Sequence, residues 1–124
     1  MKKILVFIPV YNEEESLKKT ILSIPKIVNG YKTEILIVDD GSTDDSYSVY
    51  KKIKSVKHII RKSYNLGLAD SYNTALSFAK KNYYDLLLIF DADGHYNFSD
   101  VGKLIKTLNN ENVDVVIGKR KNIY

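Results

Sequence analysis

The sequence predicts an α/β fold in which a mostly parallel sheet carries helices on both faces, as in Rossmann-like domains. Two observations predict this class. Five short runs rich in Val, Ile and Leu alternate with segments whose apolar residues recur at helical spacing. Polar and charged residues follow directly after these runs, where a parallel sheet gathers its strand ends along one edge. The length of 124 residues predicts one domain, residues 1–124.

The expected strands cover residues 4–8, 34–38, 56–60, 85–90 and 113–117. In the first helical segment Leu17, Ile21 and Ile24 fall on one face. In the third helical segment the expected apolar face comprises Ala69, Tyr72, Leu76 and Ala79. Pro25 disfavours helix at the residue before it, so the first helix should end nearby. Gly30 should then turn the chain back.

Two pairs of residues have the spacing of capping boxes directly after expected strands. Asn12 is followed by Glu15, and Ser42 is followed by Asp45. In a capping box the first side chain and the second bond each other's backbone N–H groups, which opens a helix. We therefore expect helices to begin at these pairs. For Asn12, and for Tyr11 beside it, a contact to a nucleobase is an alternative role that is compatible with loop closure.

Composition limits the classes of function. Hydrophobic residues at 44% and charged residues at 27% are ordinary for a soluble globular domain. The net charge of +4 suits anionic ligands or a phospholipid surface, and it is too small and dispersed to indicate nucleic acid binding. The absence of Cys excludes disulfides and Cys-ligated zinc. The first apolar run is too short for a signal peptide, so we expect a cytoplasmic protein, with the cytoplasmic face of the membrane as an alternative.

The fourth apolar run ends in two acidic residues, Asp91 and Asp93. At the carboxyl end of a buried strand, such a pair points into the crevice where open α/β sheets bind ligands. Two carboxylates can hold Mg²⁺ or Mn²⁺ against a substrate diphosphate, so both are predicted to be metal ligands and catalytic residues. His95 is a further candidate metal ligand through a ring nitrogen. Solvated turn acids and a passive surface histidine are the alternatives.

The other strand ends carry groups suited to a nucleotide. Asp39 and Asp40 can accept hydrogen bonds from base N–H or ribose hydroxyl groups, while Gly41 permits a tight turn. Arg120 can make paired hydrogen bonds to phosphate oxygens. A plain helix-opening turn and a solvated arginine are the alternatives. The strand ends also bring Tyr11, Asn12, Arg61, Asn65 and Gly67 to this edge as further candidates for nucleotide binding, with Pro9 and Glu13 beside them.

Five segments resemble, in order and approximate spacing, the motifs of family 2 glycosyltransferases with the GT-A fold. They read Phe7-Ile-Pro-Val-Tyr-Asn-Glu13, Ile37-Val-Asp-Asp-Gly-Ser-Thr-Asp44, Asn65-Leu-Gly67, Phe90-Asp-Ala-Asp-Gly94 and Val116-Ile-Gly-Lys-Arg120. Within that family the chain is similar throughout its length to the dolichol-phosphate mannose synthase-like branch. Five ordered motifs are far more specific than any one of them.

The resemblance implies a metal-dependent, inverting transfer of a sugar from a nucleotide-diphosphate sugar, either GDP-mannose or a UDP-sugar, with polyprenyl or dolichyl phosphate as the favoured acceptor. It implies a nucleoside pocket lined by Pro9, Tyr11, Glu13 and Asp39. Asp91 and Asp93 would face the metal and the diphosphate, and Arg120 would contact phosphate. His95 stands where that branch usually has glutamine as a metal ligand, and Thr74 stands where the family often has glycine.

The resemblance covers only the donor-binding half of a typical family domain, so a truncated GT-A fold is expected. The other half usually supplies a catalytic carboxylate, acceptor-binding elements and often a membrane-associating segment. A non-catalytic nucleotide-sugar-binding fragment or partner subunit is therefore an alternative, as are peripheral membrane association and self-association. A receiver-type signalling domain is a remote alternative, because it needs an acidic pair after the first strand, where this chain has Pro9-Val-Tyr-Asn12.

Overall fold

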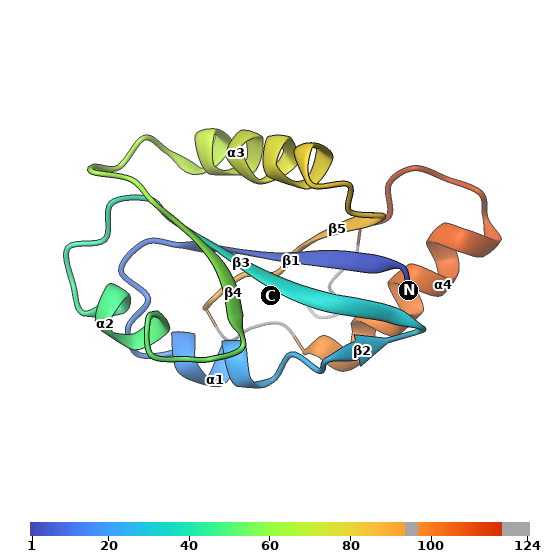
Figure 1. Cartoon of the computed structure of the whole chain (residues 1–124), viewed down its shortest axis with the longest axis horizontal. Coiled ribbons are helices and arrows are strands. Elements are labelled where there is room, and N and C mark those ends of the chain that lie inside the picture. The colour runs from blue at the N-terminus through green and yellow to red at the C-terminus, as the bar shows by residue number, and fades with distance from the viewer. Residues whose placement is uncertain (94–96, 118–124) are drawn as a thin grey trace, which may run out of the picture.

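The computed structural model describes residues 1–93 and 97–117, and it confirms the α/β class with a mostly parallel sheet (Figure 1). The parallel strands are β1 (Lys3–Val10), β3 (Tyr31–Asp39), β4 (Val56–Arg61) and β5 (Leu86–Ile89). Their order across the sheet is β4, β3, β1, β5. Val10 of β1 lies opposite Asp39 of β3, and Asp39 lies opposite Arg61 of β4, so three strands reach their carboxyl ends at the same level.

Helices cover both faces of this sheet, as expected. They are α1 (Leu17–Leu22), α2 (Ser46–Tyr50), α3 (Leu68–Lys81) and α4 (Val101–Asn110), which follows a short 3₁₀ helix, η1 (Phe98–Asp100). In Figure 1, α3 lies above the strands, and α1 and α2 lie below them. Alternate side chains of β1 serve the two layers: Val6 and Ile8 join the core beneath, while Leu5 and Phe7 pack with Ala75 of α3. The central strand is buried on both sides, which explains its continuous apolar run.

The expected strand at residues 113–117 is wrong. This segment adopts no regular structure, and its apolar residues Val113, Val115 and Ile117 are 43%, 73% and 84% exposed. A β-branched run becomes a strand only where a neighbouring strand pairs with its backbone and one face is buried. Within the described residues, no strand pairs with this segment or with the outer edge of β5. The β-branched pattern of residues 113–117 therefore did not produce a strand, because no neighbouring strand among the described residues pairs with it.

A short hairpin precedes β3 and was not expected. The two-residue strand β2 (Ile27–Val28) pairs antiparallel with the start of β3. Asn29 and Gly30 join them at φ of 48° and 82°, the positive values that a two-residue hairpin turn requires at both positions. The expected turn at Gly30 and the end of α1 before Pro25 are therefore confirmed. The Asn-Gly pair was the sequence signal for the hairpin itself.

The buried face of α3 differs from the expected one. Its buried residues are Ser71, Ala75 and Ala79, which are small and let the helix lie close to the sheet. Of the four residues expected on this face, only Ala79 is buried. Leu68, Tyr72 and Leu76 are instead 54%, 36% and 51% exposed, at four-residue spacing along one side of the helix. These three residues are called the α3 stripe below.

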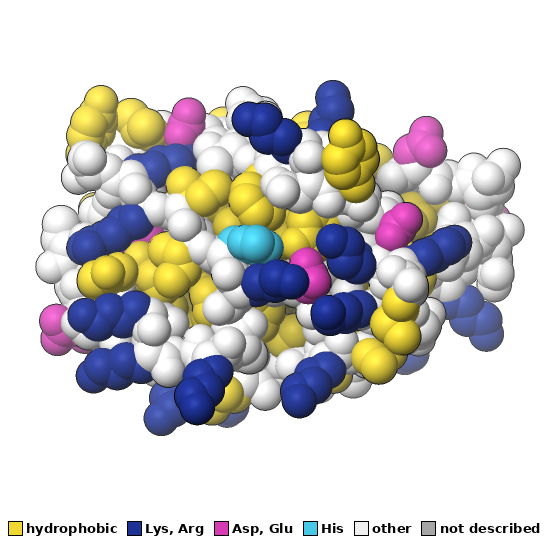
Figure 2. All heavy atoms as spheres, in the orientation of Figure 1, with side chains coloured by type: hydrophobic (Ala, Val, Ile, Leu, Met, Phe, Trp, Pro, Cys, Tyr) yellow, Lys and Arg dark blue, Asp and Glu magenta, His cyan; other side chains and the backbone are white. Residues whose placement is uncertain are grey.

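A buried glutamate, Glu34 of β3, lies among basic side chains. Figure 2 shows many Lys and Arg side chains on the face of the molecule drawn there. The ammonium of Lys57 donates to Glu34 Oε2 at 2.8 Å, and the hydroxyl of Tyr84 donates to Oε1 at 2.5 Å. The Nζ atoms of Lys3 and Lys32 lie 3.9 and 3.7 Å from the carboxylate. Burial acts to raise the pKa of Glu34, but these hydrogen bonds and positive charges outweigh it and lower the pKa to about 2.

We predict that Glu34 stabilises the fold most above its ordinary pKa of 4.5, and that this contribution is lost as the pH falls from 4.5 towards about 2. The sign follows because the folded protein binds the proton more weakly than the unfolded chain does. Glu34→Gln should lower the free energy of unfolding at pH 7 by about 2 kcal/mol and flatten its decline in acid. Urea unfolding between pH 7 and pH 3 measures both effects. Equal pH slopes for the variant and the wild type would contradict the prediction, and Glu111→Gln, at an exposed position, is the control.

Candidate functional site

The loops that follow β1 and β3 are tied together by hydrogen bonds. Asn12 Oδ1 accepts from the N–H groups of Thr43 and Asp44 at 2.8 and 3.2 Å. The N–H of Asn12 donates to Ser42 Oγ at 3.0 Å. Asn12 adopts a φ of 53°, a left-handed conformation that asparagine tolerates better than most residues. The two loops therefore form one unit at the carboxyl edge of the sheet.

These contacts correct the expected capping boxes at Asn12 with Glu15 and at Ser42 with Asp45. Both α1 and α2 begin after these pairs, and neither N-cap residue makes a side-chain capping bond. Short polar side chains bond whichever backbone groups lie near them, and the parallel pairing of β1 with β3 places the two loops side by side. Asn12 and Ser42 consequently cap each other's loops rather than their own helices.

Asp39 is fully buried at the end of β3 and holds three neighbours. Its Oδ1 accepts from the N–H of Ser42 at 2.9 Å, and its Oδ2 accepts from the hydroxyl of Tyr50 at 2.8 Å. The Nε of Arg61 lies 4.0 Å from the same Oδ2, and its guanidinium lies 4.0 Å above the ring of Tyr47. Burial, together with the hydrogen bond and charge of Asp39, raises the pKa of Tyr50. The phenol therefore stays protonated and remains a donor to Asp39.

Asp40 clamps a third loop. Its two carboxylate oxygens accept from the N–H groups of Leu66 and Gly67 at 2.8 and 2.9 Å. Its own N–H donates to the carbonyl of Val10 at 2.8 Å, which fixes it to β1. The clamped loop carries Asn65 with its side chain exposed. Asp40 therefore sets the position of Asn65 at the same edge.

The sequence assigned both acids to direct contacts with a nucleoside, whereas the structure shows them buried and accepting hydrogen bonds from the protein's own donors. These bonds shape this edge of the sheet, and direct contact of either acid with a nucleoside stays a prediction. Tyr47 and Tyr50 were missed by sequence reasoning. The available signal was that Tyr50 shares a helical face with Ser46, four residues before it, and that a buried tyrosine hydroxyl needs a partner.

Gly41 lies where two loops approach each other closely. Its φ is +78°, and a Cβ on this residue would lie 2.4 Å from the backbone carbonyl carbon of Tyr64. No side chain fits in that space, so Gly41 is required for the contact as well as for the turn. Its role in the structure is to let the loop clamped by Asp40 lie against the turn after β3.

Pro9 and Tyr11 lie at the end of β1. Pro9 is half-buried opposite Val38, while Tyr11 is 45% exposed. An exposed tyrosine ring offers a flat apolar face together with a polar tip, which suits a stacked base. Thr74 donates its hydroxyl to the carbonyl of Asp70 within α3 at 2.9 Å, so it is occupied by its own helix.

The acidic turn after β5 lies near the β1–α1 loop. Asp91 is half-buried and Asp93 is exposed, and Ala92 between them is 2% exposed. Burial raises the pKa of Glu13, and the negative charges of Asp93, Asp44 and Asp91 raise it further. Glu13 therefore lies in the electrostatic field of the acidic pair. The ends of β1 and β5, which are far apart in the sequence, contribute to one negative region.

These oxygen donors suit a hard cation. Within residues 1–93 and 97–117, no three acidic or histidine side chains are grouped as a complete metal cage. Mg²⁺ needs no such cage, because one or two carboxylates commonly hold it together with substrate phosphates. A bound cation would reduce the mutual repulsion among the carboxylates of Glu13, Asp91 and Asp93. His95 and Arg120 lie outside the described residues.

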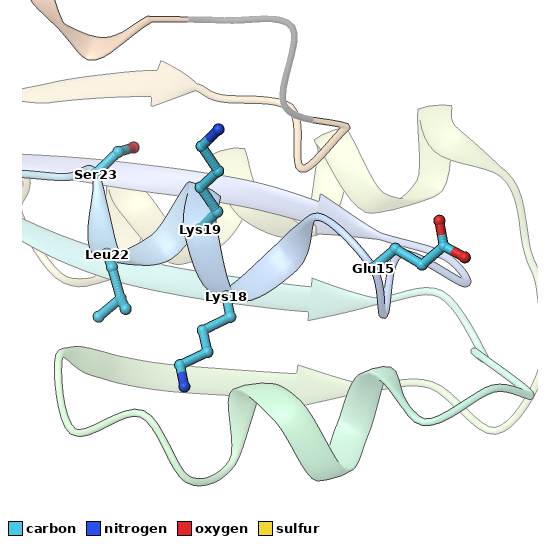
Figure 3. A pocket seen from close by; sticks show the side chains of 5 residues that line it. All are labelled: Glu15, Lys18, Lys19, Leu22 and Ser23. Carbon is cyan, nitrogen blue, oxygen red and sulfur yellow. The ribbon is translucent and has the colours of Figure 1, made fainter.

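A shallow pocket on the outer side of α1 lies apart from these groups (Figure 3). It is lined by Glu15, Lys18, Lys19, Leu22 and Ser23. None of the residues predicted to bind the nucleotide or the metal lines it. The candidate site is therefore the carboxyl edge of the sheet, where the loops after β1, β3, β4 and β5 meet.

A mostly parallel sheet with helices on both faces and an acidic pair at its carboxyl edge is the architecture of the GT-A fold. The model of the family "Glycosyl transferase family 2" matches residues 5–124, and the chain belongs to that family. The resemblance inferred from the five motifs is therefore confirmed.

Among its relatives, the UDP-N-acetylglucosamine–dolichyl-phosphate N-acetylglucosaminyltransferase of Methanococcus voltae is 30% identical, over 96% of this chain and 52% of the relative. The dolichol-phosphate mannosyltransferase of Pyrococcus furiosus is 31% identical, over 95% of this chain and 33% of the relative. A mannosyltransferase from Pyrobaculum calidifontis, solved in complex with GDP-Man and Mn²⁺, shares the fold with a TM-score of 0.71 and 24% identity, over 86% of this chain and 32% of that one. The chain spans about half the length of several curated relatives.

We predict that Gly41→Ala destabilises the protein more than Gly30→Ala does. Both glycines have a positive φ, but a Cβ at Gly30 meets no atom within 4 Å. The Gly30 variant should therefore lose only about 1 kcal/mol from backbone strain. Gly41→Ala should lose at least about 2 kcal/mol more, because the backbone at Tyr64 must move away. Urea unfolding of the two variants tests this, and equal losses would show that the close contact is not required.

Proposed function

We propose that this chain is the donor-binding half of a glycosyltransferase that uses Mg²⁺ or Mn²⁺, takes a sugar from GDP-mannose or a UDP-sugar, and passes it with inversion to polyprenyl or dolichyl phosphate. The observation that carries the proposal is the meeting of two features at one sheet edge. One is the set of loops organised by Asp39 and Asp40, and the other is the acidic turn of Asp91 and Asp93.

The nucleoside lies, in this proposal, over the ends of β1 and β3. Tyr11 and Pro9 supply apolar surface, and Asn65 supplies an exposed amide. Arg61 is half-exposed, and its contacts with Asp39 and Tyr47 restrict the guanidinium before a ligand arrives. A restrained guanidinium loses less freedom when it binds a ribose or phosphate oxygen. Asp39, Asp40 and Gly41 act from behind this surface by fixing the loops.

The diphosphate lies, in this proposal, beside Asp91 and Asp93, with Asp93 as the principal metal ligand. Asp93, with Asp91, would hold the cation, which would supply charge neutralisation for the departing nucleoside diphosphate. Glu13 adds negative potential at this end of the site. His95 stays the proposed third ligand, and Arg120 the proposed partner of a phosphate oxygen. Asn12 and Gly67 act indirectly, through the loops that they shape.

A lipid phosphate is the proposed acceptor. Relatives named for polyprenyl carriers support it, among them the undecaprenyl-phosphate mannosyltransferase of Micrococcus luteus. Such an acceptor is already an anionic nucleophile, so positioning and charge neutralisation can replace a general base. No helix in the described part of the chain has both the length and the apolarity to span a bilayer. We propose that contact with a lipid acceptor takes place at the cytoplasmic surface of the membrane.

A second candidate function is donor binding without turnover, as part of a larger assembly. Exposed apolar surface on α3 and β5 favours it, because such surface is suited to contact with another protein surface. The α3 stripe is solvent-exposed, and Ile89 of β5, whose outer edge pairs with no strand in the described residues, is 44% exposed. The rings of Tyr72 and Phe7 are perpendicular with their centroids 5.7 Å apart, and Phe7 lies opposite Ile89, so Tyr72 of the stripe lies near β5. Exposed apolar surface of this kind favours association with a second copy of the chain.

Cation dependence is the direct test of the metal-binding part. Isothermal calorimetry of UDP and of GDP should show at least about tenfold tighter binding in Mn²⁺ or Mg²⁺ than in EDTA for the nucleotide that binds better. Asp93→Asn should abolish most of that gain, because the diphosphate charge is then poorly neutralised. Asp100→Asn, at an exposed position in η1, is the matched control. Equal nucleotide affinity in EDTA and in Mn²⁺ would contradict this part of the proposal.

Turnover by the 124 residues alone should be weak, because acceptor binding and exclusion of water from the anomeric carbon require surfaces beyond the donor site. The test is release of nucleoside diphosphate from GDP-mannose and from UDP-glucose in the presence of a short polyprenyl phosphate.

Sedimentation of the chain should show self-association. The variant Leu76→Lys should associate less, because it places a charge in the α3 stripe. Rapid transfer by a monomer would show instead that the donor half is a sufficient enzyme.

A further inference from the structure

The acidic turn is held by a helix from the other end of the sequence. The carbonyl oxygen of Ala92, between Asp91 and Asp93, accepts hydrogen bonds from Ser16 Oγ and, at 3.3 Å, from Thr20 Oγ1. These donors lie 76 and 72 residues earlier in the chain. Thr20 and Ala92 are 5% and 2% exposed, so water does not compete freely for this carbonyl.

The spacing of the two hydroxyls explains how one carbonyl receives both. Ser16 is the N-cap of α1 and Thr20 lies one turn later, so both side chains point from the same side of the helix. The N–H of Thr20 donates to the carbonyl of Ser16 at 3.1 Å, and the N–H of Leu17 donates to that of Glu13 at 3.1 Å. Glu13, whose pKa responds to the acidic pair, is therefore hydrogen-bonded into the same helical segment.

The Ala92 carbonyl belongs to the peptide group that includes the nitrogen of Asp93. That group is planar, so holding the oxygen also restricts the backbone direction at Asp93. β5 ends at Ile89, so Ala92 lies beyond the strand itself. A buried carbonyl that loses its donors is costly, which favours the turn geometry in which both hydroxyls reach it.

We infer that Ser16 and Thr20 are positioning residues for cation binding. They hold the turn so that the carboxylates of Asp91 and Asp93 keep one orientation towards the cation and the diphosphate. The inference rests on the proposed function, because it takes these two aspartates as the metal ligands. Both hydroxyls act through Ala92, and that of Ser16 also hydrogen-bonds the side chain of Glu13, which belongs to the same acidic end. Neither hydroxyl is assigned a bond to the cation or to the nucleotide.

A merely structural role for the hydroxyls predicts a different result. If they only docked α1 on the turn, their loss would lower thermal stability and leave the cation dependence of nucleotide binding unchanged. A positioning role predicts that nucleotide affinity in EDTA is kept while the gain on adding Mn²⁺ shrinks. The Mn²⁺ concentration that gives half of this gain therefore separates the two roles.

The experiment uses Ser16→Ala, Thr20→Val and the double variant, with UDP and GDP as probes in calorimetric titrations at increasing Mn²⁺. The double variant should need on the order of tenfold more Mn²⁺ than the wild type for half of the gain. Ser16→Thr and Thr20→Ser retain the hydroxyls and should restore the wild-type value. Ser23→Ala is the matched control on the same helix (Figure 3), because its hydroxyl donates to the carbonyl of Thr20 at 2.6 Å and not to Ala92.

An unchanged Mn²⁺ requirement in the folded double variant overturns the inference, and so does an equal loss of affinity in EDTA and in Mn²⁺. If the double variant does not fold, Ser16→Ala decides the question, since Ser16 is only half-buried. For this single variant we expect about a threefold higher Mn²⁺ requirement. If the nucleotide affinity of the wild-type protein does not depend on Mn²⁺, the metal-dependent proposed function is contradicted, and the inference that rests on it is contradicted too.

Discussion

The burial of two adjacent carboxylates at the end of β3 is the constraint on which the site depends. A buried carboxylate must be hydrogen-bonded, and the donors to Asp39 and Asp40 come from the turn after β3, from α2 and from the loop before α3. Satisfying both acids therefore fixes these three segments relative to the sheet. The exposed groups at the edge, such as Asn65 and the guanidinium of Arg61, inherit their positions from this buried pair.

Hydrogen bonds between loops also join the proposed nucleoside end of the edge to its acidic end. The loop after β1 bonds the loop after β3 through Asn12 and Ser42, and it leads into α1. The hydroxyls of α1 then hold the carbonyl of Ala92 in the acidic turn. Hydrogen bonds at both ends of the β1–α1 segment thus connect Asp39 with the turn that carries Asp93, and the backbone of that segment links them. The proposed donor site is built by contacts between loops, and the sheet brings these loops together.

The sequence patterns predicted the features that depend on neighbouring residues in the chain, namely four of the strands and the position of the acidic pair. The runs that became β1, β3, β4 and β5 were recognisable because each is apolar and short, and the acidic pair was recognisable because it follows one of them. The segment 113–117 has the same composition but no neighbouring strand in the described residues. The buried face of α3 was missed because close packing selected Ala75 over the larger Leu76. Likewise, the hydrogen bonds of Asn12 and Tyr50 depend on segments distant in sequence, which periodicity does not reveal.

A crystal structure of this chain with Mn²⁺ and either UDP or GDP tests the central claim most directly. The account predicts the nucleoside over the ends of β1 and β3 beside Tyr11, and Mn²⁺ between the diphosphate and the carboxylate of Asp93. It also predicts that the hydrogen bonds of Asp39 to Tyr50 and of Asp40 to the Leu66 backbone are unchanged on binding. A nucleotide bound in the outer pocket of α1, or a cation distant from both Asp91 and Asp93, would contradict the account.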